Sequence, residues 1–152
     1  MRSLAIPLRI TKGGLSRIDD RKKAIDNAIG LLLTTPCFSC AADPQYGFIF
    51  NNLRFENFNE TDGVVFNSAS RIRLMEGLQG LYEKKISGSS DNLNTFAALL
   101  KETIEEYETR LRNVGVTMTY KRRERRIHIA VTGQIADTGE DYRYSSIINV
   151  WK

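Results

Sequence analysis

The hydrophobic pattern changes its period from about 3.6 residues to 2 in the C-terminal third, and this change limits the folds open to the chain. Beyond residue 113, apolar side chains alternate with small or polar ones in two stretches: Val114, Val116, Met118 and Tyr120, then Ile127, Ile129 and Val131. A polar turn at 137–141 precedes a third stretch, 142–151. Alternation predicts half-buried strands. We therefore expect a three-stranded antiparallel β-meander with one face left for helices to cover.

Helical spacing dominates the chain before this point. One helix is expected to begin after Asp19 or Asp20, either of which can cap it, and to end before Pro36. Another follows Asn94 and runs to about Arg112, with Leu99, Leu100, Ile104, Tyr107 and Leu111 on one face. The predicted fold class is α+β, with N-terminal helices packed on one face of the meander.

The middle of the chain gives a weaker pattern. Residues 46–50 are an apolar run that fits a strand or a packed loop equally well. Residues 60–92 predict an extra helix capped by Asn67 or Ser68 and ended at 87–90, whose apolar face holds Ile72, Met75, Leu78 and Tyr82. At 152 residues, the chain fits a single domain.

Two charges flank the apolar stripe of the helix expected after Asn94. At about 100° per residue, Glu108 and Arg110 fall on opposite shoulders of the stripe, about 160° apart. At that separation we expect each to find a partner other than its neighbour, since a buried unpaired charge is costly. They would hold a neighbouring backbone, cap a sheet or bind a partner protein; ordinary solvated charges are the alternative.

Glu108-Thr109-Arg110-Leu111, followed by an alternating strand, resembles the Glu-Pro-Arg-Leu signature of the contractile-tail baseplate wedge family. That family includes phage "lysozyme-like" wedge proteins and TssE of type VI secretion. Leu32-Leu33-Thr34-Thr35 resembles its Leu-Leu-x-Thr helix end, and 43–47 its Pro-Asp-Phe-Gly element. Residues 1–19 resemble its extended leader.

The sequence departs from the family pattern at three places. Thr109 replaces the usual proline, so the helix is free to run on to Asn113. Residues 37–40 read Cys-Phe-Ser-Cys where many members have Gly-Glu-Arg, which removes a glutamate associated with hydrolysis. Residues 60–92 are longer than the usual linker, and we expect them to form an insertion.

The positive charge is concentrated in one loop. Residues 121–126 hold five bases and one acid, which equals the whole net charge of +4. Arg122, Arg123, Arg125 and Arg126 are therefore candidate contacts to an acidic protein surface. The loop lacks the interleaved aromatics of a nucleic-acid-binding motif. A small basic nucleic-acid-binding module is therefore only the second alternative.

The residues give little support to redox, metal-binding or catalytic chemistry. Cys37 and Cys40 follow a helix instead of opening one, and only His128 could complete a metal site, so we expect neither redox work nor metal. Arg110 near Glu108 would keep that carboxylate ionised, opposite to the need of a general acid. No cofactor or small-molecule substrate is expected, and no catalytic residue is assigned.

The resemblance implies a structural baseplate component of a type VI secretion system or phage-like tail that links wedge core to sheath. Its partners would be other wedge proteins and sheath subunits, contacted through Glu108, Arg110 and the edge strand 142–151 with Tyr142, Tyr144 and Trp151. A peptidoglycan hydrolase of the tail is the first alternative. The chain has no stretch of about 18 apolar residues and no apolar leader, so we expect a cytoplasmic protein without membrane insertion.

Overall fold

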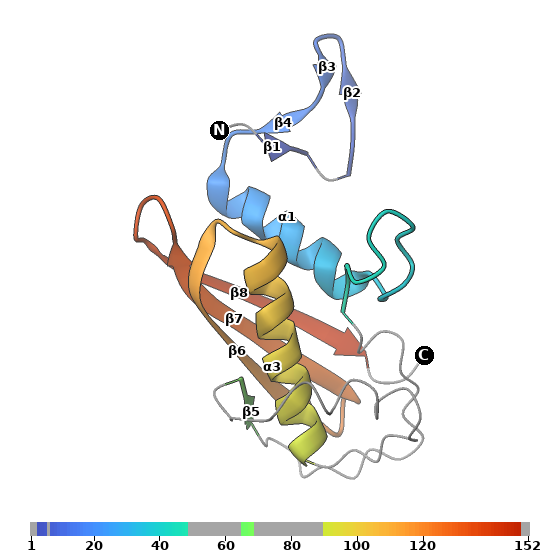
Figure 1. Cartoon of the computed structure of the whole chain (residues 1–152), viewed down its shortest axis with the longest axis vertical. Helices are drawn as coiled ribbons and strands as arrows, with labels where there is room; N and C mark the ends of the chain where they lie inside the picture. The colour runs from blue at the N-terminus through green and yellow to red at the C-terminus, as the bar shows by residue number, and fades with distance from the viewer. Residues whose placement is uncertain (1–2, 6, 49–64, 69–89, 150–152) are drawn as a thin grey trace.

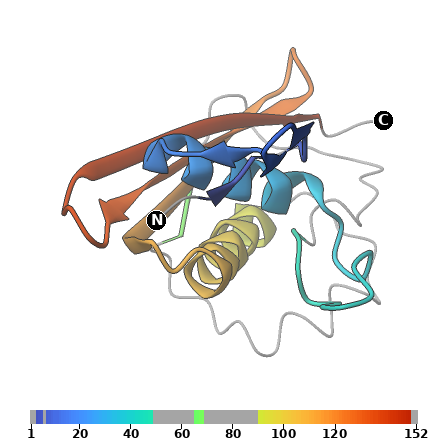
Figure 2. The same ribbon diagram turned by 90° about the horizontal axis from the view of Figure 1, so that it is seen from above.

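The computed structural model describes residues 3–5, 7–48, 65–68 and 90–149. Helices α1 (Arg21–Thr34) and α3 (Ser90–Tyr107) lie on one face of a four-stranded antiparallel sheet (Figures 1 and 2). The strands run in the order β5 (Val65–Asn67), β6 (Leu111–Lys121), β7 (Arg126–Ile135) and β8 (Asp141–Asn149). The predicted α+β class and C-terminal meander are confirmed.

The fourth strand, β5, is an addition to the predicted meander. It pairs with the outer edge of β6, with Val65 opposite Thr119 and Asn67 opposite Thr117. The next residue continues the contact, because the backbone N–H of Val116 donates to Ser68 Oγ over 3.0 Å. A strand of three residues is too short to show an alternating pattern, so no periodic signal marks it in the sequence.

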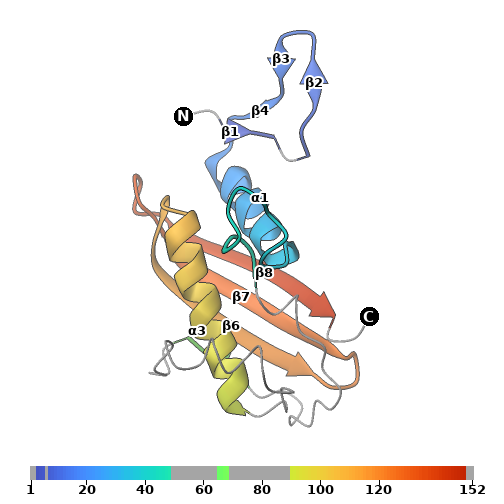
Figure 3. The same cartoon turned by 45° about the vertical axis from the view of Figure 1, so that its right-hand side comes forward.

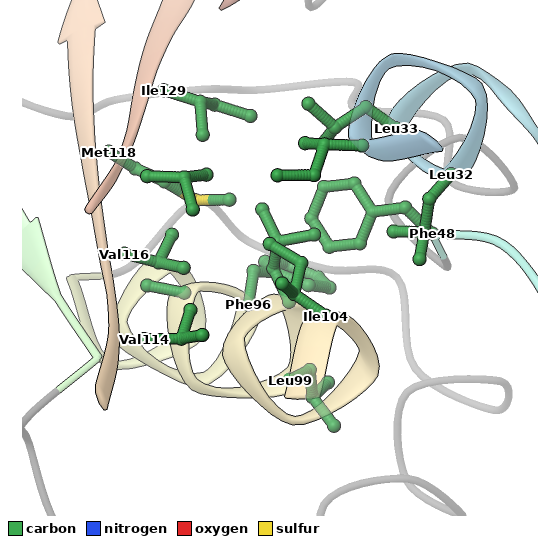
Figure 4. Packing of buried hydrophobic residues seen from close by; sticks show 14 of the residues in the cluster. Leu32, Leu33, Phe48, Phe96, Leu99, Ile104, Val114, Val116, Met118 and Ile129 are labelled. Atoms are coloured by element: carbon green, nitrogen blue, oxygen red, sulfur yellow. The ribbon is translucent and has the colours of Figure 1, made fainter. Parts of the chain in front are cut away.

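The core lies between the sheet and the two helices (Figure 4). Alternate residues of β6 and β7 point into it, so that Val116, Met118 and Ile129 face the helices and are buried. Burying one such side chain contributes about 1.5–3 kcal/mol to folding. The helices therefore cover the face of the sheet on which the alternating apolar side chains lie. Phe48 fills the space between the two helices, and the segment before it is a packed loop rather than a strand.

Helix α1 has the ends that the sequence predicted. Asp20 is the N-cap, and its side chain accepts a hydrogen bond from the N–H of Lys23 at 3.3 Å. Thr35 ends the helix in an extended conformation, as expected of the residue before Pro36.

Helix α3 ends earlier than expected. The prediction that it runs to Arg112 or Asn113 is wrong, because the helix stops at Tyr107. The chain then turns, with the N–H of Leu111 donating to the carbonyl of Glu108 at 3.1 Å, and Leu111 pairs with Ile135 of β7. Sheet pairing therefore captures the residues that a longer helix would have used.

The described residues of the leader fold back on themselves in two short antiparallel ladders. β1 (Ser3–Leu4) pairs with β4 (Arg17–Ile18), and β2 (Ile10–Thr11) pairs with β3 (Gly14–Leu15). We call residues 3–18 the N-terminal arm. It stands beyond the first turn of α1, away from the four-stranded sheet (Figures 1 and 3). The helix predicted around Ile72 to Tyr82, and Trp151, lie outside the described residues.

Candidate functional site

Glu108 and Arg110 form a direct ion pair in the turn between α3 and β6. Arg110 donates to the Glu108 carboxylate from its backbone N at 3.2 Å, from Nε at 2.6 Å and from Nη2 at 2.5 Å. The expectation that they diverge to opposite shoulders of a helix is therefore wrong. Since the helix ends at Tyr107, residues two apart in the turn share one side.

This pair sits at the boundary between core and surface. The Glu108 side chain is 5% exposed, whereas that of Arg110 is 33% exposed. The hydrogen bonds that Arg110 donates to Glu108 raise the pKa of Arg110 above its ordinary value. The carbonyl of Arg110 also accepts from the N–H of Ala136 at 2.8 Å, in the turn after β7. The pair thus fixes the guanidinium at the surface and joins the helix end to the sheet.

The two tyrosines of β8 face α1. Tyr142 is buried and donates from its hydroxyl to Asp26 Oδ1 at 2.6 Å. Burial and the hydrogen bond to Asp26 raise the pKa of Tyr142. Tyr144 lies close to Gly30, where an added Cβ would meet the tyrosine hydroxyl at 3.3 Å. Tyr142 and Tyr144, which the sequence suggested as partner contacts, therefore face inward and hold α1 on the sheet.

Strand β8 is an edge of the four-stranded sheet. It pairs with β7 along its whole length, from Asn149 opposite Arg126 to Asp141 opposite Gln134. Within the described residues, no strand pairs with its other side. Ile147, on the face away from the helices, is 52% exposed. An edge of this length offers alternate N–H and carbonyl groups to an added strand.

The basic cluster forms the tight turn between β6 and β7. Residues 122–126 are exposed, and Arg125 adopts a left-handed φ of 52°. Arg126 donates from Nε to Asn149 Oδ1 at 3.2 Å. This contact places the basic turn beside the last residues of β8, a proximity that the sequence alone did not indicate.

The loop after α1 contacts the end of α3. Tyr107 donates from its hydroxyl to Asp43 Oδ2 at 2.8 Å and packs edge-to-face against Tyr46, with ring centroids 5.1 Å apart. Burial and Asp43 raise the pKa of Tyr107 to about 12. Gly47 has a φ of 124°, and a Cβ there would lie 2.5 Å from the carbonyl oxygen of Thr35. Glycine is therefore required to return the chain to the end of α1.

The residues considered for enzymatic or metal chemistry are not assembled into such a site. Cys37 and Cys40 are not joined by a disulfide and are both partly buried, and burial raises the pKa of Cys37, opposite to what a reactive thiol needs. The described residues contain no group of three or more histidine, cysteine, aspartate or glutamate side chains placed to hold a metal ion. They also contain no helix long and apolar enough to cross a membrane.

Comparison with known proteins identifies a family and a related fold. The model of the family described as "Baseplate wedge protein gp25" matches residues 19–140. A crystal structure of a protein from Geobacter sulfurreducens, described as a candidate tail lysozyme, superposes with a TM-score of 0.60 at 14% sequence identity. The match covers 89% of this chain and 96% of that one, and shows a shared fold. A search of curated proteins found no match.

Proposed function

The chain belongs to the baseplate wedge protein gp25 family, and from this membership we propose that it links the wedge core of a contractile injection machine to its sheath. The family is structural, so the chain has a structural role in a tail baseplate, assembles with other baseplate proteins and is not an enzyme. The finer proposal is that it works in a type VI secretion system or phage-like tail, on the cytoplasmic side.

The observation that carries the sheath contact is the edge of β8. Nine residues of regular strand are paired on one side only within the described chain. The inward tyrosine Tyr142 fixes the strand to α1, so the edge is rigid before a partner arrives. A rigid edge favours strand addition, in which backbone hydrogen bonds supply affinity. The sheath subunit contributes the added strand in this proposal.

The Glu108–Arg110 turn is the proposed contact to the wedge core. Glu108 is buried and sets the position of Arg110, while a third of the Arg110 side chain reaches the surface. Arginine suits recognition of a carboxylate or of backbone carbonyls, and lysine does not reproduce its planar fork. Arg110 is thus the partner-facing member and Glu108 the internal one.

A proline scan of β8 tests the sheath contact. Successive backbone N–H groups of a strand point to opposite edges, so of Ser145→Pro and Ser146→Pro only one removes a hydrogen bond to β7. The variant that keeps the wild-type melting temperature has lost the outward N–H. We expect that variant to bind sheath subunits at least about tenfold more weakly, since a lost backbone hydrogen bond and the proline ring both oppose an added strand.

The controls are Ser145→Ala and Ser146→Ala, which remove the hydroxyl and keep the N–H. Both should retain wild-type sheath binding. If the folded proline variant also binds sheath normally, β8 is not the docking edge and the proposal fails.

The basic turn is proposed to steer association with an acidic protein surface. Reversing Arg122 and Arg125 to glutamate should slow binding to the baseplate or sheath partner, and the wild-type rate should fall as salt rises. The control is Lys23→Glu, an exposed base in the first turn of α1, outside β8 and the Glu108–Arg110 turn. Unchanged kinetics would remove this role, and a salt-dependent shift of DNA or RNA would favour nucleic-acid binding instead.

A further inference from the structure

The N-terminal arm carries most of the exposed aliphatic surface of the described chain. Leu8 and Ile10 are 65% and 87% exposed, and Leu4 and Leu15 are 48% and 49% exposed. Contiguous exposed apolar groups of this kind mark interaction surfaces. The family model begins at residue 19, so the arm lies outside the matched region.

The strand register places three of these side chains on one face. Ile10 is paired with Leu15, and Leu4 is paired with Arg17, so the members of each pair point to the same side. Residues 15 and 17 are two apart along one extended segment and share a side as well. Exposure confirms the alternation, because Leu15 and Arg17 are exposed whereas Ser16 and Ile18 are partly buried. We call Leu4, Ile10, Leu15 and Arg17 the outer face of the arm.

Backbone hydrogen bonds hold this face in shape. The N–H of Ser16 donates to the carbonyl of Arg9 at 2.8 Å, and its own carbonyl accepts from Ala5 at 2.9 Å. The two short ladders are thereby joined through one residue, with Pro7 and Leu8 outside the pairing. The hydroxyl of Thr11 donates to the carbonyl of Gly14 at 3.0 Å and closes the tip. These hydrogen bonds give the N-terminal arm a defined conformation.

Its charge indicates what it binds. Residues 3–18 contain three basic residues, Arg9, Lys12 and Arg17, and no acidic one. Two arms would repel each other, which disfavours a second copy of this chain as the occupant. Both edges of the arm lack a neighbouring strand within the described residues, and burying such unpaired backbone groups in lipid is costly. A protein groove can satisfy the same groups.

We propose that the outer face of the N-terminal arm docks on a neighbouring baseplate protein, against an apolar strip flanked by carboxylates. The inference rests on the baseplate role in naming the neighbour, but it concerns a surface separate from β8 and from the Glu108–Arg110 turn. The aliphatic side chains supply the buried contact and Arg17 supplies a charge-assisted hydrogen bond to one carboxylate.

The test uses the full-length chain in cells that make the complete machine. Ile10→Glu places a carboxylate on the outer face, and Leu31→Glu is the matched control on an exposed aliphatic of α1. Incorporation of each variant into purified baseplates is measured by quantitative mass spectrometry. We expect Ile10→Glu to fall by about tenfold or more, with an unchanged melting temperature, and Leu31→Glu to match the wild type.

Photo-crosslinking identifies the partner. A benzoyl-phenylalanine at position 10 should crosslink to one other baseplate protein, at a segment that carries apolar and acidic residues, and the same group at position 31 should not. A crosslink to lipid or to a second copy, no crosslink, or normal incorporation of Ile10→Glu would overturn the proposal. If the wild-type chain is absent from baseplates, the proposed function fails instead. If only the β8 proline variant loses sheath binding while Ile10→Glu behaves normally, the arm proposal alone fails.

Discussion

Removing the carboxylate of Glu108 should destabilise the fold itself. The side chain is 5% exposed and accepts three hydrogen bonds from Arg110, of which the bond from Nε spans 2.6 Å. A hydrogen bond to a charged group contributes about 1.5–3 kcal/mol, and breaking a fully buried pair costs about 3–5 kcal/mol. Arg110 is one-third exposed, so water replaces part of the loss. We therefore expect Glu108→Ala to lower the free energy of unfolding by about 2–4 kcal/mol.

Urea denaturation, monitored by circular dichroism, measures this change in the free energy of unfolding. For a domain of about 150 residues, each kcal/mol corresponds to about 2–4 °C in melting temperature, so a fall of roughly 5–15 °C should accompany it. A double-mutant cycle with Arg110→Met isolates the interaction between the two side chains. We expect a coupling energy of at least about 1.5 kcal/mol, since both charged hydrogen bonds join the same pair.

Two results would refute the reasoning. A coupling energy below about 0.5 kcal/mol would mean that the pair does not act as a unit in solution. A Glu108→Ala variant with wild-type stability that fails to enter baseplates would make Glu108 an interface residue. Glu108→Gln serves as a shape-matched control and should fall between the wild type and the alanine variant, because the amide keeps one acceptor but loses the charge.

Three further predictions follow from the loop after α1 and its contact with α3. Gly47→Ala should cost at least about 2 kcal/mol by urea denaturation, since its Cβ would lie 2.5 Å from a backbone oxygen, whereas Gly13→Ala, with open space around it, should change little. Replacing Cys37 and Cys40 together by serine should cost on the order of 1 kcal/mol per site and leave assembly intact; stoichiometric zinc or lost assembly of the folded variant would contradict this. The pKa of Tyr107, raised to about 12 from 10, makes the neutral hydroxyl more stable in the folded state. Its contribution is therefore full below pH 10 and lost as pH rises toward 12, and Tyr107→Phe should remove that part of the alkaline loss of melting temperature.

Short-range sequence patterns are sufficient to predict the helices and strands that depend only on their own residues. The alternation from Val114 to Val131 and the helix between Asp20 and Pro36 both depend on short-range periodicity and capping, and the structure confirms them. Asp19 and Asp20 are both credible caps by sequence, and the hydrogen bond that the Lys23 N–H donates to the Asp20 side chain identifies Asp20 as the cap.

Features that depend on distant pairing were missed or misread. The end of α3 depends on Leu111 pairing with Ile135, 24 residues away in sequence, and no helical pattern contains that information. A helix that continued past Tyr107 would separate Glu108 and Arg110 around its axis, whereas the turn that replaces it brings them into contact. The partnership of Tyr142 with Asp26 spans a separation of 116 residues and had no signal in the sequence.

The segment 107–111 shows why scaffold and docking roles must be separated by measurement. Tyr107 binds Asp43 in the loop after α1, Glu108 binds Arg110, and the Arg110 carbonyl binds Ala136 in the turn before β8. One short stretch therefore sets both the position of Arg110 and the path into the edge strand, and a substitution there alters the fold and the proposed contacts together. A loss of assembly caused by unfolding still differs in size from one caused by a damaged contact surface. A variant that retains about 2 kcal/mol of stability remains about 97% folded, so unfolding alone lowers the binding-competent fraction by only a few per cent. Any tenfold loss of assembly at that stability must therefore come from the contact surface.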